Sequence, residues 1–339
     1  MRSLPCAEAP LPSIKSEVGE RVATTTLSVL TYNIEGLAWP ARRGRARYLR
    51  EIGARLAKLR EAGQSPDVVL FQEVFSNNAK RAVAATGYSA TTSGPKRTTR
   101  APRPRPDPLP GRSSPKRGEL GIRFLGSGLA IASRYPIVHT EVQAYGRRSC
   151  AGIDCLSNKG LVLARIIMPG VPTPVDLYNT HMNSRLASRA PAEREAAAHD
   201  RQSLMASEFI NRTHLDAYPL VFGGDFNMAN SEARWDHFSR HQSLSLVHHV
   251  CNEPSSGCDV RMSWDGDAPW MDTQDLQFFW SGDVVSIRPV RVEAMFDGSP
   301  GSPMLSDHDG FLVTYELAWQ QGRERPAAQL CRGDPDSRS

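Results

Sequence analysis

The chain has 339 residues, of which 40% are hydrophobic and 23% charged, with 41 Lys+Arg against 36 Asp+Glu. This composition is ordinary for a globular protein and excludes a disordered, collagen-like or coiled-coil chain. No apolar run approaches the roughly eighteen residues of a membrane span, which excludes an integral membrane protein, and residues 1–26 lack the apolar core of a signal peptide. The length allows one large domain or two medium ones.

Apolar runs predict eight strands, and helical periodicity predicts two helices. The strands are expected at residues 27–32, 67–74, 127–132, 160–168, 174–182, 218–226, 276–280 and 310–317. The helices are expected at residues 46–62, which end before Pro66, and at residues 192–212. Many strands with few helices indicate sheet packed on sheet with outer helices, in place of a strictly alternating parallel fold.

The excess of positive charge lies in one segment between the second and third predicted strands. Residues 94–118 hold eight Lys+Arg, seven Pro and one acid, so the rest of the chain has 33 basic and 35 acidic residues, a net charge of −2. Because proline removes backbone donors, we expect an extended, solvated insertion without helix or sheet pairing. The segment is either a mobile arm that contacts phosphates or a loop whose charges keep it soluble. We favour the loop, because the segment has no aromatic residue that could stack on the bases of a single strand.

The six cysteines lie among Gly, Ser, Pro, Asn and Asp residues, outside the apolar runs, at positions 6, 150, 155, 251, 258 and 331. Free cysteines are usually buried, so this placement favours disulfides. The pairs 150/155 and 251/258 can bridge locally and 6/331 would join the tails, whereas no spacing resembles a zinc site. Disulfides favour a secreted or periplasmic protein, although no signal peptide is expected in this chain.

Polar residues stand at the ends of the apolar runs, where a strand delivers a side chain to the rim of a sheet. They are Asn33, Glu73, His181, Asn183, Asp225, Asn227, Asp307 and His308, with Asp275 just before an aromatic strand. Singly, each is more typical of a turn or loop residue than of a ligand or catalyst. Together, oxygen ligands such as Glu73 suit Mg²⁺, and two histidines supply a proton acceptor and a proton donor for phosphoryl chemistry.

The ordered segments that carry these residues are TYNIEG, FQEVF, GSGLAIASRYPI, LSNKG, YNTHMNS, GGDFNM, QDLQFFW and SDHDG. This set resembles the endonuclease/exonuclease/phosphatase superfamily, which includes pancreatic deoxyribonuclease, over residues 26–318. Within that superfamily, FQEVFSNNA and CAGIDCLSNKG are most similar to segments of the neutral and bacterial sphingomyelinases.

The resemblance implies an α/β fold, a four-layer αββα sandwich of two mixed β-sheets flanked by helices. It implies a single catalytic domain over residues 26–318 that contains the insertion at 94–118, with tails at 1–25 and 319–339. The implied activity is metal-dependent hydrolysis of a phosphodiester with Mg²⁺, or with Mn²⁺ or Ca²⁺ in its place.

The resemblance also implies the metal ligands. Glu73 matches the main ligand and Asn33 assists it. Asp225 and Asn227 match residues across the cleft that orient the nucleophilic water or a metal and the phosphate. We expect one strong metal site at Glu73, and a second, weaker one near Asp225 stays open.

Two histidines match catalytic positions. His308 matches the general base, with Asp275 as the carboxylate that holds its imidazole and Asp307 beside it. His181 matches a second histidine that polarises the phosphoryl oxygen or protonates the leaving group. The sequence leaves open which of the two is the acid.

Lys159 and Asn183 are the candidate contacts to substrate phosphate. In the resemblance, Lys159 belongs to a loop from Asp154 that could meet an anionic head group. The residues alone fit equally well a turn with a solvated lysine, because Asn158 and Gly160 are turn formers.

Departures from the family pattern bear on the substrate. Residues 281–306 carry one aromatic, Phe296, and no evident hydrophobic hairpin, and Asn183 stands where sphingomyelinases place Gln. We therefore expect a phospholipid head group or small phosphodiester as substrate, and a monomer without an obligate protein partner. The alternatives are a DNA endonuclease, disfavoured by the acidic body, an inositol-phosphate phosphatase, disfavoured because GGDFNM lacks a following basic residue, and a non-catalytic binding module.

Overall fold

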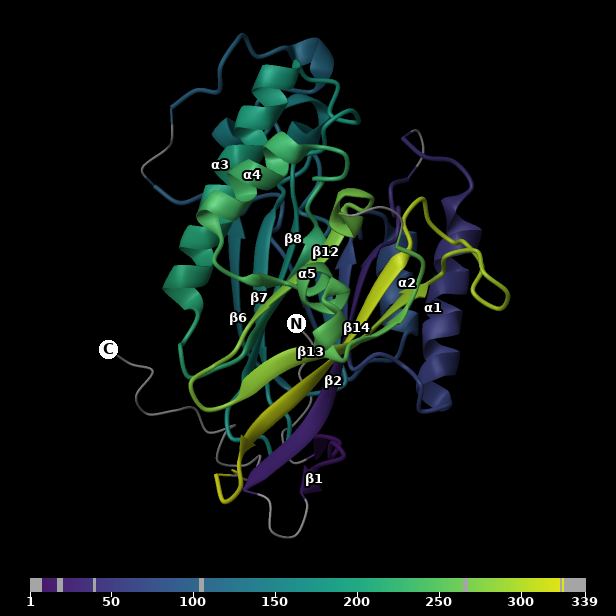
Figure 1. The fold of residues 1–339 in the computed structure, drawn as a ribbon. Helices are drawn as coiled ribbons and strands as arrows, with labels where there is room; N and C mark the ends of the chain where they lie inside the picture. Colours follow the sequence, from purple (N-terminus) through teal and green to yellow (C-terminus); the bar gives the residue numbers. More distant parts are fainter. Residues whose placement is uncertain are drawn as a thin grey trace.

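Two β-sheets lie face to face and helices cover both outer surfaces (Figure 1). The computed structural model describes residues 8–16, 21–38, 41–103, 107–264, 268–323 and 325, and the structural statements below concern these residues. Each sheet contains both parallel and antiparallel pairs. The expected four-layer αββα sandwich is confirmed.

The larger sheet has eight strands in the described residues, in the order β11-β13-β14-β2-β3-β5-β4, with β1 added against β2. Its strands are β1 (Lys15–Ser16), β2 (Val22–Asn33), β3 (Val68–Gln72), β4 (Ala90–Ser93), β5 (Ala130–Ser133), β11 (Asp259–Arg261), β13 (Ser286–Met295) and β14 (Gly310–Gln320). β2 and β14 pair from Val22 with Gln320 to Thr31 with Phe311, so both strands extend beyond residues 26 and 318.

The smaller sheet has six strands in the described residues, in the order β10-β12-β9-β8-β7-β6. They are β6 (Ile137–Ala144), β7 (Gly160–Ile166), β8 (Val175–His181), β9 (Leu220–Asp225), β10 (Ser245–Leu246) and β12 (Asp275–Trp280). β8 and β9 run parallel, while β12 runs antiparallel to β9. The C-terminal ends of β8 and β9 therefore lie beside the N-terminal end of β12.

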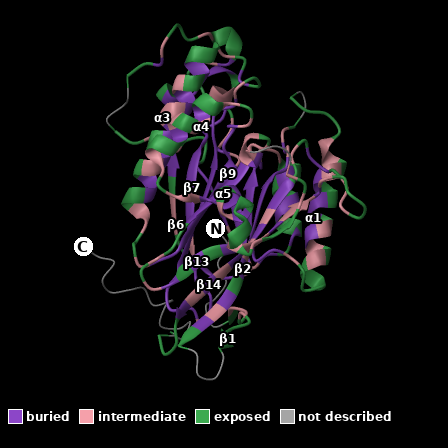
Figure 2. Cartoon of the chain, viewed as in Figure 1, coloured by how far each residue is buried: buried purple, intermediate pink, exposed green. Residues whose placement is uncertain are grey.

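Helices on each outer surface bury one apolar side. α1 (Arg45–Glu61) and α2 (Asn77–Ala85) cover the larger sheet, whereas α3 (Ala192–Thr213) and α4 (Glu232–His241) cover the smaller one (Figure 1). Leu49, Ile52 and Leu56 recur at helical spacing in α1, and all three are buried while the outer side of the helix is exposed (Figure 2). The other helices lie in the connections between these elements. They are α5 (Val247–Asn252) and the 3₁₀ helices η2 (Pro115–Arg117), η3 (Arg147–Ser149), η4 (Gly152–Leu156), η5 (Pro254–Ser256) and η6 (Pro269–Met271).

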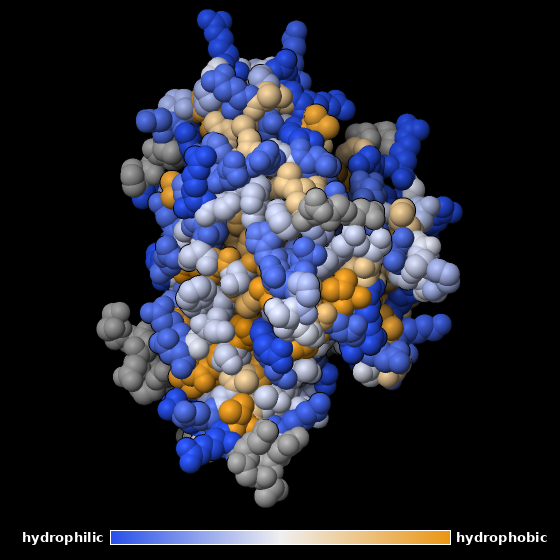
Figure 3. All heavy atoms as spheres, in the orientation of Figure 1, coloured by the Kyte–Doolittle hydropathy of each residue, from blue (hydrophilic) through white to orange (hydrophobic). Residues whose placement is uncertain are grey.

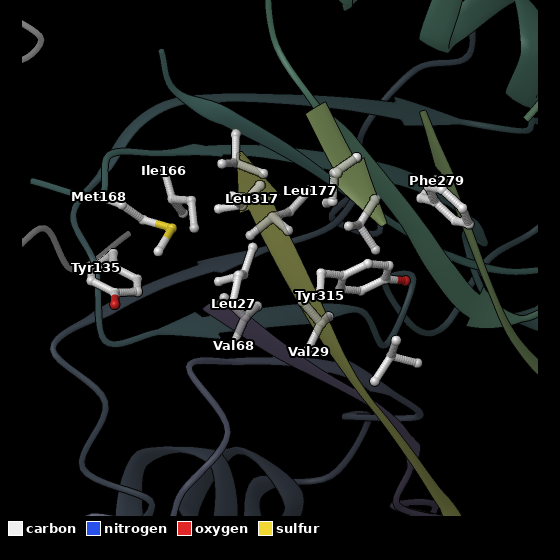
Figure 4. Packing of buried hydrophobic residues seen from close by; sticks show 14 of the residues in the cluster. Leu27, Val29, Val68, Tyr135, Ile166, Met168, Leu177, Phe279, Tyr315 and Leu317 are labelled. Atoms are coloured by element: carbon white, nitrogen blue, oxygen red, sulfur yellow. The ribbon is translucent and has the colours of Figure 1, made fainter. Parts of the chain in front are cut away.

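Between the sheets lies the main hydrophobic core, formed by inward-facing strand residues such as Leu27, Val68, Leu177 and Leu317 (Figure 4). Buried amides join the two sheets across this core. Gln277 Nε2 of the smaller sheet donates to the carbonyls of Val29 and Phe311, each at 3.0 Å. Gln72 Nε2 of the larger sheet donates to Asn179 Oδ1 at 2.7 Å. Since a buried amide is costly unless it is paired, these bonds specify how one sheet sits on the other.

The insertion at 94–118 is not the freely solvated segment expected. In its described part, Leu109 is buried against Ala151 and Ala198. Side chains from outside the insertion donate hydrogen bonds to its backbone carbonyls. Asn158 Nδ2 donates to the carbonyls of Lys96 and Thr99, and Arg194 donates to the carbonyls of residues 109–111. Prolines leave carbonyls without internal partners, so the body supplies the donors that the segment itself lacks.

Substituting Arg194 by Gln is expected to release this insertion. Arg194 donates to the carbonyls at residues 109–111 and pairs with Glu119 at 2.8 Å, and losing these charge-assisted bonds should raise local opening about tenfold or more. The measurement is the rate of tryptic cleavage after Arg112 and Lys116. The exposed Arg240→Gln on α4 is the control, and equal cleavage rates in the two variants would contradict the expectation.

Two of the expected disulfides are present, Cys150–Cys155 and Cys251–Cys258. The third expected pair, Cys6 with Cys331, lies outside the described residues. The first bridge closes the loop that contains η4, beside the candidate site. None of the helices in the described part of the chain combines the length and apolar character needed to cross a membrane.

Candidate active site

Strand register brings three of the predicted residues into one row. His181 ends β8, Asp225 ends β9 and Asp275 begins β12, and Asp225 is the register partner of both others. From the facing sheet, Asn33 ends β2 and Glu73 follows β3 directly. These strand ends meet at the upper end of the sandwich in Figure 1. The structure thus brings these five predicted residues to one rim.

Asp225 lies at the centre of the cluster. Its Oδ2 accepts from Asn33 Nδ2 at 3.0 Å, which links the two sheets. Its Oδ1 accepts from the backbone and side-chain nitrogens of Asn227, at 3.0 and 2.9 Å. Asn227 has φ 54°, a left-handed conformation that favours a short polar residue and turns its amide back onto Asp225.

Both histidines converge on the same oxygen of Asp225. His181 Nε2 lies 3.3 Å and His308 Nε2 lies 3.9 Å from Asp225 Oδ2. His308 Nδ1 lies 2.5 Å from Asp275 Oδ2, so one carboxylate holds the far side of its ring. A substrate atom placed between the two Nε2 atoms would contact both imidazoles and the central carboxylate.

The surroundings drive the two imidazoles toward opposite charge. Burial opposes a charge on His308, but the carboxylate of Asp275, assisted by Asp225, outweighs it and raises the pKa of His308 to about 11. Burial lowers the pKa of His181 well below its ordinary value, and the charges of Lys159 and His308 lower it further. At neutral pH, His308 is thus an imidazolium and His181 a neutral imidazole. Burial also raises the pKa of Asp225, against the opposing charge of His308.

Glu73 is held in a strained position beside Asn33. Its φ is 59°, unusual for a non-glycine residue. A Cβ on Gly36 would stand 2.2 Å from the Glu73 carbonyl oxygen, so only glycine permits this close approach. Burial raises the pKa of the Glu73 carboxyl, while Lys159, His308 and a hydrogen bond from Asn33 lower it.

This donor set fits a hard divalent cation. Within the described ranges, no three His, Cys, Asp or Glu side chains converge into a closed metal cage. Mg²⁺ does not need one, because it retains several waters and binds through one or two carboxylates plus substrate phosphate. The Glu73 carboxylate is partly buried, which disfavours its ionisation, and it would gain a compensating positive charge from such an ion. Glu73 with Asn33 therefore suits Mg²⁺ better than a thiolate- or imidazole-selective metal.

Lys159 is not the solvated lysine of a turn. It is buried, its Nζ pairs with Asp154 Oδ1 at 3.1 Å, and it donates to the carbonyl of Met182 at 2.8 Å. Asp154 Oδ2 in turn accepts from the backbone and hydroxyl of Ser184. The loop from Asp154 to Lys159 therefore fixes the segment that follows His181.

Substituting Lys159 by Met is expected to destabilise the fold by about 3–5 kcal/mol, because it leaves the Asp154 carboxylate without its cation in a largely buried position. The midpoint of urea unfolding measures the effect. Adding Asp154→Asn to Lys159→Met should recover part of the loss. The exposed Lys58→Met on α1 is the control, and a Lys159 variant as stable as that control would refute the expectation.

Two predicted residues do not reach the site as expected. Asn183 is fully buried: its Oδ1 accepts from the Ala151 backbone and its Nδ2 donates to the Ser184 carbonyl, so it fastens loops and presents nothing to a phosphate. Asp307 faces outward and pairs with Arg42 at 3.2 Å, so Asp275 alone holds His308 through a direct hydrogen bond.

The sequence reasoning missed two supports of the Asp225–Asn227 turn. Arg234 on α4 is buried, pairs with Glu195, and donates to the carbonyls of Asn183 and Asn227, each at 2.8 Å. His199 Nε2 on α3 lies 2.8 Å from the Phe226 carbonyl. Both residues come from outer helices, and their only sequence signal is a polar residue on an otherwise buried helical face.

Comparison with solved structures shows the same fold in several proteins. Sphingomyelinase C from Streptomyces griseocarneus is similar at 22% identity and a TM-score of 0.58, over 85% of this chain and 99% of that chain. A Staphylococcus aureus beta toxin mutant with bound magnesium ions is 17% identical, with a TM-score of 0.55 over 88% and 100% of the two chains. D. rerio TDP2 complexed with single strand DNA product is 15% identical, with a TM-score of 0.55 over 86% and 98%. A comparison with curated proteins by sequence found no match.

A protein-family model described as the endonuclease/exonuclease/phosphatase family matches residues 30–308. That span begins in β2, ends at His308, and contains Asn33, Glu73, His181 and Asp225 as well. The chain belongs to the endonuclease/exonuclease/phosphatase family.

Proposed function

We propose that this protein is a Mg²⁺-dependent phosphodiesterase that hydrolyses a phospholipid head group or another small phosphodiester. The observation that carries the proposal is the convergence of His181 and His308 on one oxygen of Asp225, with the Glu73–Asn33 pair facing them from the other sheet. In-line hydrolysis of a diester needs neutralised phosphoryl charge, a proton acceptor and a proton donor, and this arrangement offers all three.

Each residue then has a role that its position supports. Glu73 and Asn33 would hold Mg²⁺, which supplies positive charge to the phosphoryl oxygens when bound. Asp225, fixed by Asn227 and Asn33, orients the attacking water and takes its proton. The neutral His181 faces the same water from the end of β8.

His308 completes the reaction as the proton donor. The family resemblance matches this residue to a base, but its place between the carboxylates of Asp275 and Asp225 supports a protonated ring in the resting enzyme. As water attacks phosphorus, the bond to the leaving oxygen breaks and His308 Nε2 transfers its proton to that oxygen. Asp275 keeps the ring oriented and stabilises its charge before transfer.

The relatives' names support this substrate class without fixing it. One neighbour is a sphingomyelinase C and another is a beta toxin with bound magnesium ions, so the fold carries lipid phosphodiesterase chemistry and divalent metal elsewhere. We further propose that the expected domain, extended to residues 22–320 by the paired strands β2 and β14, acts as one catalytic domain in a monomer. DNA cleavage is the competing function, because TDP2 with a single strand DNA product shares the fold.

A substrate panel tests the proposal. Purified protein is assayed on bis-p-nitrophenyl phosphate, sphingomyelin, phosphatidylcholine and supercoiled plasmid DNA, with Mg²⁺, Mn²⁺ or Ca²⁺ and with EDTA. We expect hydrolysis of a lipid or a small diester, and we expect EDTA to abolish this hydrolysis. Plasmid nicking without lipid or small-diester hydrolysis would favour the nuclease, and no hydrolysis under any metal would overturn both functions.

A further inference from the structure

A large cavity outside the active site has eight arginines among its lining residues. It measures about 1210 Å³ and lies between the insertion, the end of β6 and the outer face of α3. One acid, Glu208, lines it against eight guanidinium groups, those of Arg97, Arg100, Arg103, Arg123, Arg147, Arg148, Arg201 and Arg212.

Four of these eight guanidinium groups have no acidic partner among the described residues. Among the described residues, Arg212 pairs with Glu141 at 3.2 Å, whereas Arg97, Arg100, Arg123 and Arg147 pair with no acid. Burial and the neighbouring Arg147 lower the pKa of Arg123, as expected where like charges crowd together. A cavity with so many uncompensated cations attracts an anionic partner.

Beside this cavity, the segment Leu120, Gly121, Ile122, Arg123, Phe124 exposes large apolar side chains. Leu120, Ile122 and Phe124 are 48%, 58% and 56% exposed. The chain bends at residues 120–121, where Gly121 has φ 70°, and the Phe124 N–H then donates to the Leu156 carbonyl at 2.8 Å, so the segment is anchored to the η4 loop while the three apolar side chains remain exposed. Ile122 also lines the arginine cavity, so apolar and cationic groups share one surface.

This surface adjoins the candidate active site. Phe124 contacts the η4 loop through Leu156, and in that loop Asp154 bonds to Ser184, which lies three residues after His181. Ile153 and Leu186, on the two loops in that chain of contacts, are exposed as well. In the upper part of the face drawn in Figure 3, hydrophobic residues stand among hydrophilic ones.

We propose that this surface docks on a phospholipid bilayer that contains anionic lipid. Leu120, Ile122 and Phe124 enter the head-group region, and the arginine cavity behind them takes up anionic head groups. Exposed apolar side chains beside unpaired arginines are what an interfacial anchor requires, whereas a nucleic-acid groove needs the cations but not the apolar residues. The inference rests on the proposed lipid phosphodiesterase function and adds how that site reaches its substrate.

Sedimentation with vesicles tests the apolar part. Binding is compared on vesicles of phosphatidylcholine alone and of phosphatidylcholine with about 30% phosphatidylglycerol, all in EDTA. The triple variant Leu120→Ser, Ile122→Ser, Phe124→Ser should bind the anionic vesicles at least about tenfold more weakly. A control triple, Val138→Ser, Leu215→Ser, Val260→Ser, removes apolar residues of 38–39% exposure on other surfaces and should bind as wild type.

A second triple, Arg97→Gln, Arg100→Gln, Arg123→Gln, tests the cationic part. It should lose most of the preference for anionic over neutral vesicles, whereas Arg50→Gln, Arg81→Gln, Arg240→Gln, which removes exposed arginines elsewhere, should keep it. Wild-type binding by both test variants would overturn the proposal. So would tight binding of single-stranded DNA by the wild type without affinity for vesicles.

Two controls separate this inference from the proposed function. Glu73→Gln should bind vesicles as wild type, since binding needs no catalysis. The apolar triple should still hydrolyse soluble bis-p-nitrophenyl phosphate at the wild-type rate while losing hydrolysis of vesicle lipid. Vesicle binding without hydrolysis of any substrate would leave the docking surface standing and overturn the proposed function alone.

Discussion

Substituting Glu73 by Gln is expected to lower kcat for bis-p-nitrophenyl phosphate by about 10³-fold or more. The amide keeps the size and shape of the side chain but removes the partly buried negative charge that would hold Mg²⁺ beside Asn33. Burial disfavours a carboxylate whose charge is not compensated. In the absence of metal, the free energy of unfolding of the variant should therefore be at least as large as that of the wild type. Steady-state kinetics, urea unfolding and calorimetric Mg²⁺ titration measure the three quantities.

The matched control is Glu61→Gln at the exposed end of α1, which makes the same chemical change far from the cluster. It should retain both activity and Mg²⁺ binding. A Glu73→Gln variant that binds Mg²⁺ with wild-type affinity would show that the metal is held elsewhere, with Asp225 as the next residue to test.

Several of the strands that sequence patterns predicted are buried on both faces. β3, β7, β8 and β9 read as continuous apolar runs because one face packs in the central core and the other under helices. β6 and β13 were missed for physical reasons. β6 is an edge strand with exposed polar residues, and Pro289 interrupts β13, where the register shifts before Arg291.

Helices were predicted where periodicity was long and missed where it was short. α1 and α3 begin and end within one residue of the predicted limits. α2 presents a face of alanines, Ala79 and Ala82 with Val83, too weak a stripe to separate from a loop. α4 buries Phe238 together with the charged Arg234, whose partners come from segments distant in sequence.

At the site, position was predictable but orientation was not. The sequence placed Asn33, Glu73, His181 and Asp225 at strand ends, and sheet register brings those ends together. Asn183 lies only two residues after His181 at the end of the same strand. Its side chain nevertheless turns away from the site and bonds to the backbone of Ala151 and Ser184. Which way a strand-end side chain turns depends on backbone groups far along the chain, here Ala151, and no local pattern carries that information.

Substituting His308 by Gln, or His181 by Gln, is expected to lower kcat by about 10²–10⁴-fold in each case. Since both imidazoles face the same oxygen of Asp225, the double variant should lose much less than the product of the single losses. The exposed His139→Gln on the edge strand β6 is the control and should keep wild-type activity. Multiplicative losses in the double variant would show that the two histidines act independently.

The pH dependence distinguishes the two rings, and Asp275→Asn exposes the difference. Asp275 raises the pKa of His308, so His308 keeps its proton until the pH rises toward about 11, and activity that needs this proton falls only on that alkaline side. Without the carboxylate the pKa of His308 drops, and the alkaline fall in kcat should move to lower pH. The charged His308 ring also stabilises the folded state. This contribution is complete at a pH below the pKa of His308 in the unfolded chain, and it is lost as the pH rises through the pKa of His308 in the folded protein. Asp275→Asn should therefore lower the free energy of unfolding most at acidic to neutral pH. NMR titration of the His308 ring measures the shift directly, and an unchanged titration would show that Asp275 does not hold the proton on His308.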